Sequence, residues 1–253
     1  MADVHDQSPA RVRMEWGPVG ADALAPGVDC AVVVDVLSFT TTLSVAVDLG
    51  AEVFPYRWQD ATAAEFARSH DAVLAVGRFE ARASDGPARV SLSPHSIRSA
   101  VELRRLVLPS PNGSSISARL AESGVPVVAA CLRNRAAVAR WLVGRAVGNV
   151  AVIPAGERWP DGSLRPAVED LWGAGAVIAA LDDLGMDDLS PEAAAAAAAF
   201  RVVRADVLTA LRRSSGGREL AAAGFDDDVA VAAEVDASEA VPLLASGRFV
   251  DAA

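Results

Sequence analysis

Short apolar runs, separated by stretches with helical spacing, alternate along the first two thirds of the chain. The clearest run, Ala31–Val36, is rich in valine and has the pattern of a strand that is buried on both faces. Arg11–Trp16 alternates between apolar and polar residues, which predicts an edge strand. Five further strands are predicted, over Glu52–Tyr56, Ala72–Val76, Arg105–Leu108, Val125–Ala130 and Val150–Pro154.

The segments between these runs predict helices. Ser38–Thr42 offers hydroxyl groups where a helix would begin, and Leu43–Leu49 continues with helical spacing to Gly50, which is a suitable C-cap. Further helices are predicted over Asp60–Arg68, from near Ser114, and over Asn134–Val143. Strands that alternate with helices in this way predict an α/β fold with three α/β/α layers and a largely parallel or mixed sheet.

The pattern changes to mainly helical from about residue 169. Helices are predicted over Glu169–Leu184, over Pro191–Arg213 with Ser190 as N-cap, and over Arg218–Ala223. Neither a Pro/Gly-rich linker nor a break in composition marks a boundary between domains. We therefore expect a single domain over residues 1–253, with a helical C-terminal portion.

Composition and charge narrow the class of protein. The 253 residues are 52% hydrophobic and carry a net charge of −10, which disfavours a nucleic-acid partner because phosphate backbones require a basic face. No apolar run approaches the length that crosses a bilayer, so no membrane association is expected. The two cysteines, Cys30 and Cys131, each lie in an apolar stretch and are interpreted as buried thiols in a reducing cytoplasm.

Polar residues that directly follow the predicted strands are the candidates for chemistry, because ligands bind at the carboxyl ends of strands in an open α/β sheet. An acid at the end of a buried strand, Asp35, would gain from a cation, and Thr41 and Thr42 behind it could bind an anion at a helix N-terminus. The alternative is an acid satisfied by neighbouring backbone groups and an ordinary helix cap. Asn112, Gly113 and Ser114 form a small turn that a phosphate could approach closely, although such turns are common.

Two more segments have the same position after a strand. Arg133 could reach a phosphate or a carboxylate, while Asn134 is equally explained as a helix N-cap. Glu157 follows another strand, and Glu169 and Asp170 open a long helix, where their charge also complements the helix dipole. If these acids meet Asp35, they form a site for a hard cation, Mg²⁺ rather than zinc, since the three histidines are scattered.

Taken in order, these segments resemble the 2-phosphosulfolactate phosphatase family. The family pattern is an Asp-Val-Leu-Arg-Ala-Thr-Thr-Thr segment, an Asn-Ser-Pro loop, Thr-Asn-Gly-Thr, Leu-Asn before a helix, and Ser-Leu-Glu-Asp followed by Ala-Gly. The similar segments here are Asp35–Thr42, Leu92-Ser93-Pro94, Pro111–Ser114, Arg133-Asn134, and Ser163-Leu164 with Glu169-Asp170 and Ala174-Gly175. The residues from Gly224 to Pro242 also look similar to the C-terminal part of the family.

The resemblance implies a three-layer fold and Mg²⁺-dependent hydrolysis of the phosphate ester of a small 2-hydroxy acid. Our hypothesis is that some of Asp35, Glu157, Glu169 and Asp170 hold Mg²⁺, and that Asp35, Glu169 and Asp170 are catalytic. The substrate contacts are expected from Thr41, Thr42, Ser93, Asn112, Gly113, Ser114, Arg133 and Asn134, and Arg133 or Arg78 could recognise the acid group of the substrate. The chain departs from the family pattern at Ser38 (arginine in the family), at Arg78 (usually glutamate) and at Leu92, and it has a short insertion over Arg165–Val168. A member that binds a phosphorylated metabolite without turnover is therefore the alternative. A homodimer is expected only from base rates.

Overall fold

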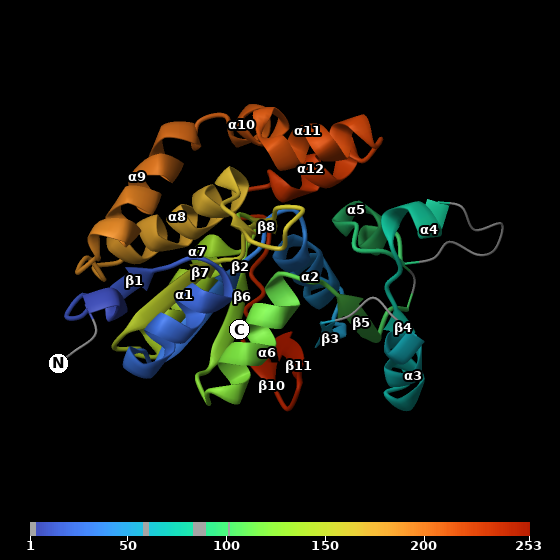
Figure 1. Ribbon diagram of the computed structural model, residues 1–253, viewed down its shortest axis with the longest axis horizontal. Helices are drawn as coiled ribbons and strands as arrows, with labels where there is room; N and C mark the ends of the chain where they lie inside the picture. The colour runs from blue at the N-terminus through green and yellow to red at the C-terminus, as the bar shows by residue number, and fades with distance from the viewer. Residues whose placement is uncertain (1–3, 58–60, 83–89, 101) are drawn as a thin grey trace.

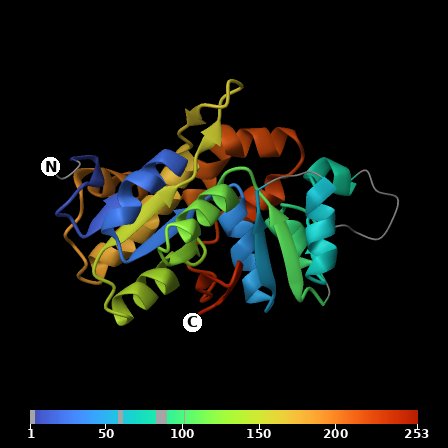
Figure 2. The ribbon, with the colours of Figure 1, turned by 60° about the horizontal axis from the view of Figure 1, so that its bottom comes forward.

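The computed structural model describes residues 4–57, 61–82, 90–100 and 102–253. The strands of this described part form one large sheet, in the order β1-β7-β2-β6-β10-β11-β3-β5-β4 (Figure 1). Their bounds are β1 Val12–Met14, β2 Cys30–Val34, β3 Glu52–Tyr56, β4 Val73–Leu74, β5 Arg105–Pro109, β6 Val127–Ala130, β7 Val150–Pro154, β10 Pro242–Ala245 and β11 Arg248–Asp251. A separate hairpin pairs β8 (Glu157–Arg158) with β9 (Leu164–Arg165), and Figure 2 shows it projecting from the body.

The large sheet has two parallel halves that are joined by an antiparallel hairpin. One half contains β1, β7, β2 and β6, and the other contains β3, β5 and β4. The hairpin β10–β11 lies between them, where Leu243 pairs with Val128 on one side and Phe249 pairs with Val53 on the other. Figure 1 draws this hairpin in red, between β6 and β3.

Alternation along the valine-rich strand β2 explains how helices cover both faces of the sheet. Val32 and Val34 point into a core formed with α7 (Arg135–Gly144) and α8 (Val168–Asp183), while Ala31 and Val33 point into the opposite core. The helices of that second core are α1 (Gly17–Leu24), α2 (Phe39–Asp48), α5 (Pro94–Arg98) and α6 (Gly113–Glu122). All four β2 side chains are fully buried. The predicted three-layer α/β/α architecture is confirmed.

Helices after α8 extend the chain over one end of the sheet. They are α9 (Pro191–Val203), α10 (Val207–Arg213), α11 (Ser215–Ala222) and α12 (Asp226–Ala232), and the last three lie together along the top of Figure 1. Two short helices, α3 (Ala61–Ser69) and α4 (Arg78–Arg82), follow β3 and β4, and 3-10 turns occur at Val4–Asp6 and Ala25–Gly27. Among the described residues, no helix combines the length and the apolar character needed to cross a membrane.

Most of the predicted elements occur within a few residues of their predicted bounds, with one clear error and several omissions. The single helix predicted over Pro191–Arg213 is wrong, because the chain turns after Val203 and a new helix begins. Asp206 starts that helix by accepting a hydrogen bond from the Thr209 amide at 3.2 Å. The helices α1, α4, α5 and α12 and both hairpins were not predicted. Cys30 and Cys131 are both buried and free, as predicted.

Candidate active site

Asp35 directly follows β2 and is 6% exposed, at the point where α2 and α6 begin. Its two carboxylate oxygens accept hydrogen bonds from the amides of Phe39 and Gly113, each at 3.1 Å. Thr40, the first of the three threonines that follow Asp35, bonds with its hydroxyl to the backbone N–H and C=O of Asp35. Burial raises the pKa of Asp35 to about 6, although the two amides favour its ionised form.

Asp170 lies in the first turn of α8 and is 3% exposed. Its carboxylate accepts from the amide of Val36 at 2.7 Å and from the amide of Gly156 at 2.9 Å. Asp170 thereby joins the ends of the neighbouring strands β2 and β7. Burial, and next the negative charge of Asp35, raise the pKa of Asp170 well above its ordinary value.

Glu157 and Glu169 complete a group of four carboxylates. Glu157 follows β7, is partly buried, and accepts a hydrogen bond from the side-chain amide of Asn112 at 3.0 Å. Burial, followed by the charge of Asp35, raises the pKa of Glu157 to about 7. Glu169 is 3% exposed, and no hydrogen bond to its carboxylate is found within the described part of the chain. The negative charges of these four groups act on one another, so a cation placed among them would be strongly stabilised.

Gly113 is required for the contact between the Asn112 turn and Asp35. A Cβ atom at this position would lie 2.4 Å from Cδ1 of Phe39 and 2.9 Å from Oδ2 of Asp35. Both contacts are closer than real Cβ atoms show, so only glycine lets the amide approach the carboxylate. The structure therefore brings together Asp35, Glu157, Glu169, Asp170, Asn112 and Gly113, from segments far apart in the sequence.

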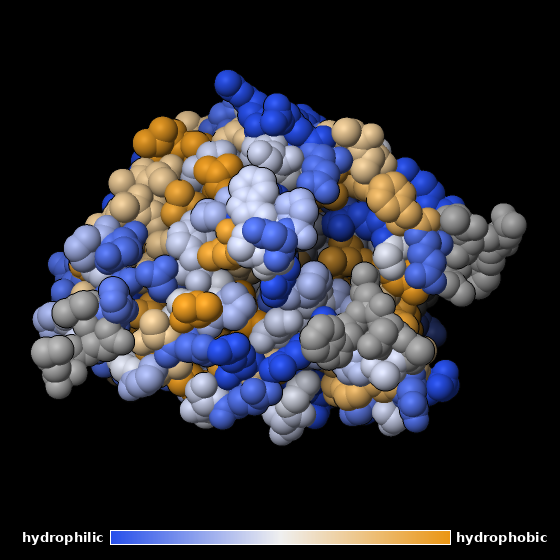
Figure 3. All heavy atoms as spheres, in the orientation of Figure 1, coloured by the Kyte–Doolittle hydropathy of each residue, from blue (hydrophilic) through white to orange (hydrophobic). Residues whose placement is uncertain are grey.

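A cationic side chain lies on the other wall of the site. Arg78, at the start of α4, donates from Nε to Asp228 of α12 at 2.8 Å, and its Nη2 donates to the Ser38 hydroxyl. Asp228, which sequence reasoning missed, is 1% exposed and also accepts from the hydroxyl of Ser93 and the amide of His95. Figure 3 shows the molecular face hollowed near the place where Figure 1 draws α5 and α12. The sequence signal for Asp228 is the run of three consecutive acids at the start of α12, but the run does not indicate which of them is buried.

Comparison with known proteins now adds an independent finding. Residues 22–247 match the family model described as 2-phosphosulpholactate phosphatase. The chain belongs to the 2-phosphosulfolactate phosphatase family. Proteins named "Probable 2-phosphosulfolactate phosphatase" from Deinococcus radiodurans and Thermus thermophilus are each 33% identical to it, over 88% of this chain and 91% of each relative. One from Thermosynechococcus vestitus is 31% identical over 96% of both chains. The resemblance inferred from the order of motifs is confirmed.

In this family member, several residues predicted to hold the phosphoryl group are occupied elsewhere. Thr41 is fully buried and donates to the carbonyl of Val36, and Thr42 is fully buried inside α2. The Ser114 hydroxyl lies within hydrogen-bond distance of the carbonyls of Tyr56 and Ser110, and it can donate to either of them. The hydroxyl groups of Thr41 and Ser114 are thus used within the protein, the Thr42 hydroxyl is buried without a partner, and their contact with a ligand stays a prediction. They are turned inward because the start of each helix is packed against a strand end.

Arg133 and Asn134 are also structural in this phosphatase family member. The Arg133 guanidinium is 4% exposed and pairs with Asp48 at 2.9 Å and with Glu234 at 3.1 Å. Asn134 is fully buried, accepts from the amide of Cys131 and donates to the carbonyls of Ala129 and Ala240. Arg133 is thus held by α2 and by the segment around Glu234, and Asn134 ties β6 to the C-terminal segment, while their substrate contacts stay a prediction. Asn134 precedes α7 but makes no side-chain bond to a helix amide.

The Ser93 loop and two departures from the family pattern, Leu92 and the insertion, have structural explanations. Ser93 caps α5 and donates to Asp228, so its hydroxyl is engaged within the wall of the site. Leu92 packs against the core beneath the sheet. The insertion begins in β9, where Arg165 pairs with Glu157 across the hairpin. Within the described ranges, no group of three or more His, Cys, Asp or Glu side chains is close enough to form a metal site by itself.

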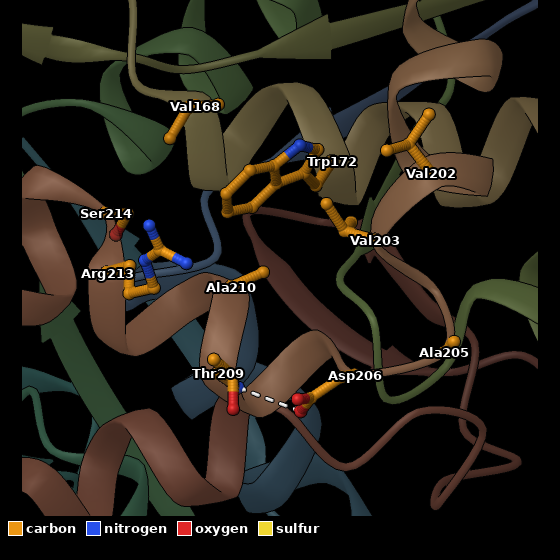
Figure 4. A pocket seen from close by; sticks show the side chains of 10 residues that line it. All are labelled: Val168, Trp172, Val202, Val203, Ala205, Asp206, Thr209, Ala210, Arg213 and Ser214. Atoms are coloured by element: carbon orange, nitrogen blue, oxygen red, sulfur yellow. Dashed lines mark hydrogen bonds between the residues drawn. The ribbon is translucent and has the colours of Figure 1, made fainter.

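One cavity of this phosphatase family member lies beside the carboxylates, and a second one borders the start of α8. One, of about 260 Å³, is lined by Asn112, Glu157 and the β8–β9 hairpin. The other, of about 530 Å³, lies between α8, α9 and α10, and Figure 4 shows the indole of Trp172 and the guanidinium of Arg213 at its wall. This second cavity borders Val168 but contains none of the four carboxylates.

Proposed function

We propose that the protein hydrolyses the phosphate ester of a small, anionic 2-hydroxy acid, such as 2-phosphosulfolactate, with the help of Mg²⁺. The observation that carries the proposal is the group of four carboxylates at the ends of β2 and β7, next to the Asn112 turn. Burying so many ionised acids without a cation is unfavourable. The raised pKa values of Asp35, Glu157 and Asp170 reflect this cost. The names of the relatives support the same substrate.

The donor set fits a magnesium ion. Mg²⁺ keeps several of its waters and binds through one or two carboxylates together with phosphate oxygens of the substrate, so a preformed cage of three ligands is not required. Glu169 accepts no hydrogen bond within the described part of the chain, and Glu157 accepts one on a single oxygen. Asp35 and Asp170 already accept amide hydrogen bonds on both oxygens. Glu169 and Glu157 would therefore hold the ion, with Asp35 and Asp170 behind them, directly or through water.

Hydrolysis needs a water molecule to attack phosphorus while the ester P–O bond breaks, which releases inorganic phosphate and the hydroxy acid. The ion would offset negative charge on the phosphoryl oxygens. The carboxylates would orient the water and accept its proton. Arg78 is the remaining candidate for recognising the acid group of the substrate, since Arg133 is sealed by Asp48 and Glu234.

The position of Arg78 favours catalysis over the non-catalytic alternative. A guanidinium placed among the four carboxylates would take the place of a cation and favour a binding protein without turnover. Arg78 instead forms its ion pair with Asp228 and its other hydrogen bond with Ser38, while its charge also favours the ionised form of Asp35. A cytoplasmic location and a homodimer stay predictions from the sequence.

Hydrolysis of an aryl phosphate and of a panel of 2-phospho-hydroxy acids tests the proposal. Turnover should require Mg²⁺, stop with EDTA, and return when Mg²⁺ is added in excess. Asp35→Asn keeps the size of the side chain and should lower kcat at least about a hundredfold without loss of the fold, which circular dichroism checks. Absence of EDTA-sensitive turnover on every ester would favour the binding protein.

A further inference from the structure

The amide groups expected to hold a phosphoryl group at the strand ends are already used by the protein itself. The amides of Phe39 and Gly113 donate to Asp35, and the amides of Val36 and Gly156 donate to Asp170. The hydroxyl groups of the same turns donate to backbone carbonyls. A phosphate ester at this site therefore needs donors from another element.

The N-terminal turn of α11 lies against the carboxylate group. A Cβ atom on Gly216 would be 2.2 Å from Oε1 of Glu169 and 3.4 Å from Cδ1 of Leu37, in the loop that follows Asp35. The third amide of the helix, on Gly217, is capped by the Ser214 hydroxyl at 3.0 Å. The first two amides, on Ser215 and Gly216, donate to no acceptor in the described part of the chain, as is usual for amides that begin a helix.

Glu169 supplies a second and independent indication of a ligand at this turn. Its side chain is 3% exposed, it accepts no hydrogen bond from any described residue, and one of its oxygens lies against Gly216. A carboxylate that is held at this position without a hydrogen-bond donor from the described residues is expected to contact a ligand. The two free amides can donate to phosphoryl oxygens, and the neighbouring carboxylate can bind a cation that contacts the same phosphate.

We infer that the first turn of α11 is the phosphate-binding turn of the site. The backbone amides of Ser215 and Gly216 donate to phosphoryl oxygens of the ester, next to the ion that Glu169 would hold. Position 216 is glycine because a side chain there would displace Glu169. This inference rests on the proposed function, and it assigns part of the site to the C-terminal helices, outside the strand ends where phosphate was expected.

Substitution of Ser215 by proline removes one of these amides with little strain. Proline is favoured at the first position of a helix, where its missing N–H leaves no intrahelical bond unmade. The preceding residue, Ser214, has φ −63° and ψ 164°, which is the extended conformation that a following proline requires. Ser215→Ala is the reference, because it removes the same hydroxyl group but keeps the amide.

Binding of inorganic phosphate, the expected product, is measured by calorimetry in MgCl₂ for both variants. Ser215→Pro should bind phosphate about tenfold more weakly than Ser215→Ala, the loss expected for one hydrogen bond to a charged group. Equal thermal midpoints of the two variants would show that α11 is intact. Equal affinities in two folded variants would overturn the inference.

A second measurement needs no variant. In the ¹⁵N–¹H NMR spectrum of the intact protein, phosphate should shift the amide resonances of Ser215 and Gly216. If phosphate shifts other resonances and leaves these two in place, the inference is wrong while the proposed function stands. If the wild-type protein neither binds phosphate nor hydrolyses any ester, the proposed function fails, and this inference fails with it.

Discussion

Replacing Glu157 by glutamine should stabilise the metal-free protein while it impairs the proposed site. The pKa of Glu157 is raised from about 4.5 to about 7, chiefly by burial. The separation between these values corresponds to about 3 kcal/mol of unfavourable free energy for the ionised side chain. Because Glu157 is partly exposed, solvent screens some of this cost, and we expect a gain of about 1.5 kcal/mol. Glutamine keeps an oxygen that can accept the hydrogen bond from Asn112.

The gain in stability from Glu157→Gln should increase as the pH rises, because the pKa of Glu157 is raised in the folded protein. Below about pH 4.5 Glu157 is neutral in both the folded and the unfolded protein, so its ionisation costs nothing. As the pH rises, the unfolded chain loses this proton first, and the folded protein loses stability until about pH 7. Glutamine does not ionise. Its advantage should therefore be about 1.5 kcal/mol near pH 8 and below about 0.5 kcal/mol near pH 5.

Urea unfolding in EDTA at these two pH values measures the difference, since EDTA keeps metal ions from compensating the charge. Glu219→Gln is the matched control, because Glu219 is exposed on α11 and its side chain makes no hydrogen bond to another described residue. It should change the free energy of unfolding by less than about 0.5 kcal/mol at either pH. A Glu157→Gln variant that is no more stable than the wild type near pH 8, or that is stabilised equally at both pH values, would refute the reasoning.

Two further predictions concern the walls of the site. Arg78→Ala should raise KM about tenfold for an ester that carries a second acid group, and much less for an aryl phosphate. Steady-state kinetics on both esters measures the two effects. Equal effects on the two esters would argue against recognition of the acid group by Arg78. Gly113→Ala should lower the free energy of unfolding by about 1–3 kcal/mol because its Cβ would meet Phe39 and Asp35. Gly144→Ala, whose Cβ would meet nothing within 4 Å, is the control, and equal thermal midpoints of the two variants would contradict the prediction.

The sequence was sufficient to predict the layers of the fold and the meeting of Asp35 with Asp170 and the Asn112 turn. These predictions are possible because the periodicity of a strand is a local property of the sequence. The carboxyl ends of parallel strands then lie at the same edge of the sheet, independently of how individual side chains pack. The roles of individual donors could not be predicted in the same way. Arg133 follows a strand just as Asp35 does, yet its partners Asp48 and Glu234 are 85 and 101 residues away. Only the folded chain shows that this guanidinium faces inward.

The omitted elements are short, and their signals are weak or ambiguous. The hairpin β10–β11 has strands of four residues around Ser246-Gly247, a turn that is visible in the sequence but easily overlooked within a helical region. Asp228 is one of three consecutive acids at the start of α12, and all three have the favourable position that an N-terminal turn gives. Its selection depends on Arg78, which lies 150 residues earlier.

The central position of the β10–β11 hairpin has a consequence for synthesis in the cell. Either half of the sheet can begin to collapse on the ribosome, but the pairs Val128–Leu243 and Val53–Phe249 form only after nearly the whole chain has been translated. Until then β6 and β3 present open edges, which are the places where nascent chains associate wrongly. A chain truncated shortly before residue 242 would keep every carboxylate of the site. Its sheet would nevertheless lack the strands that join the two halves, so chaperones and proteases would bind the incompletely folded chain.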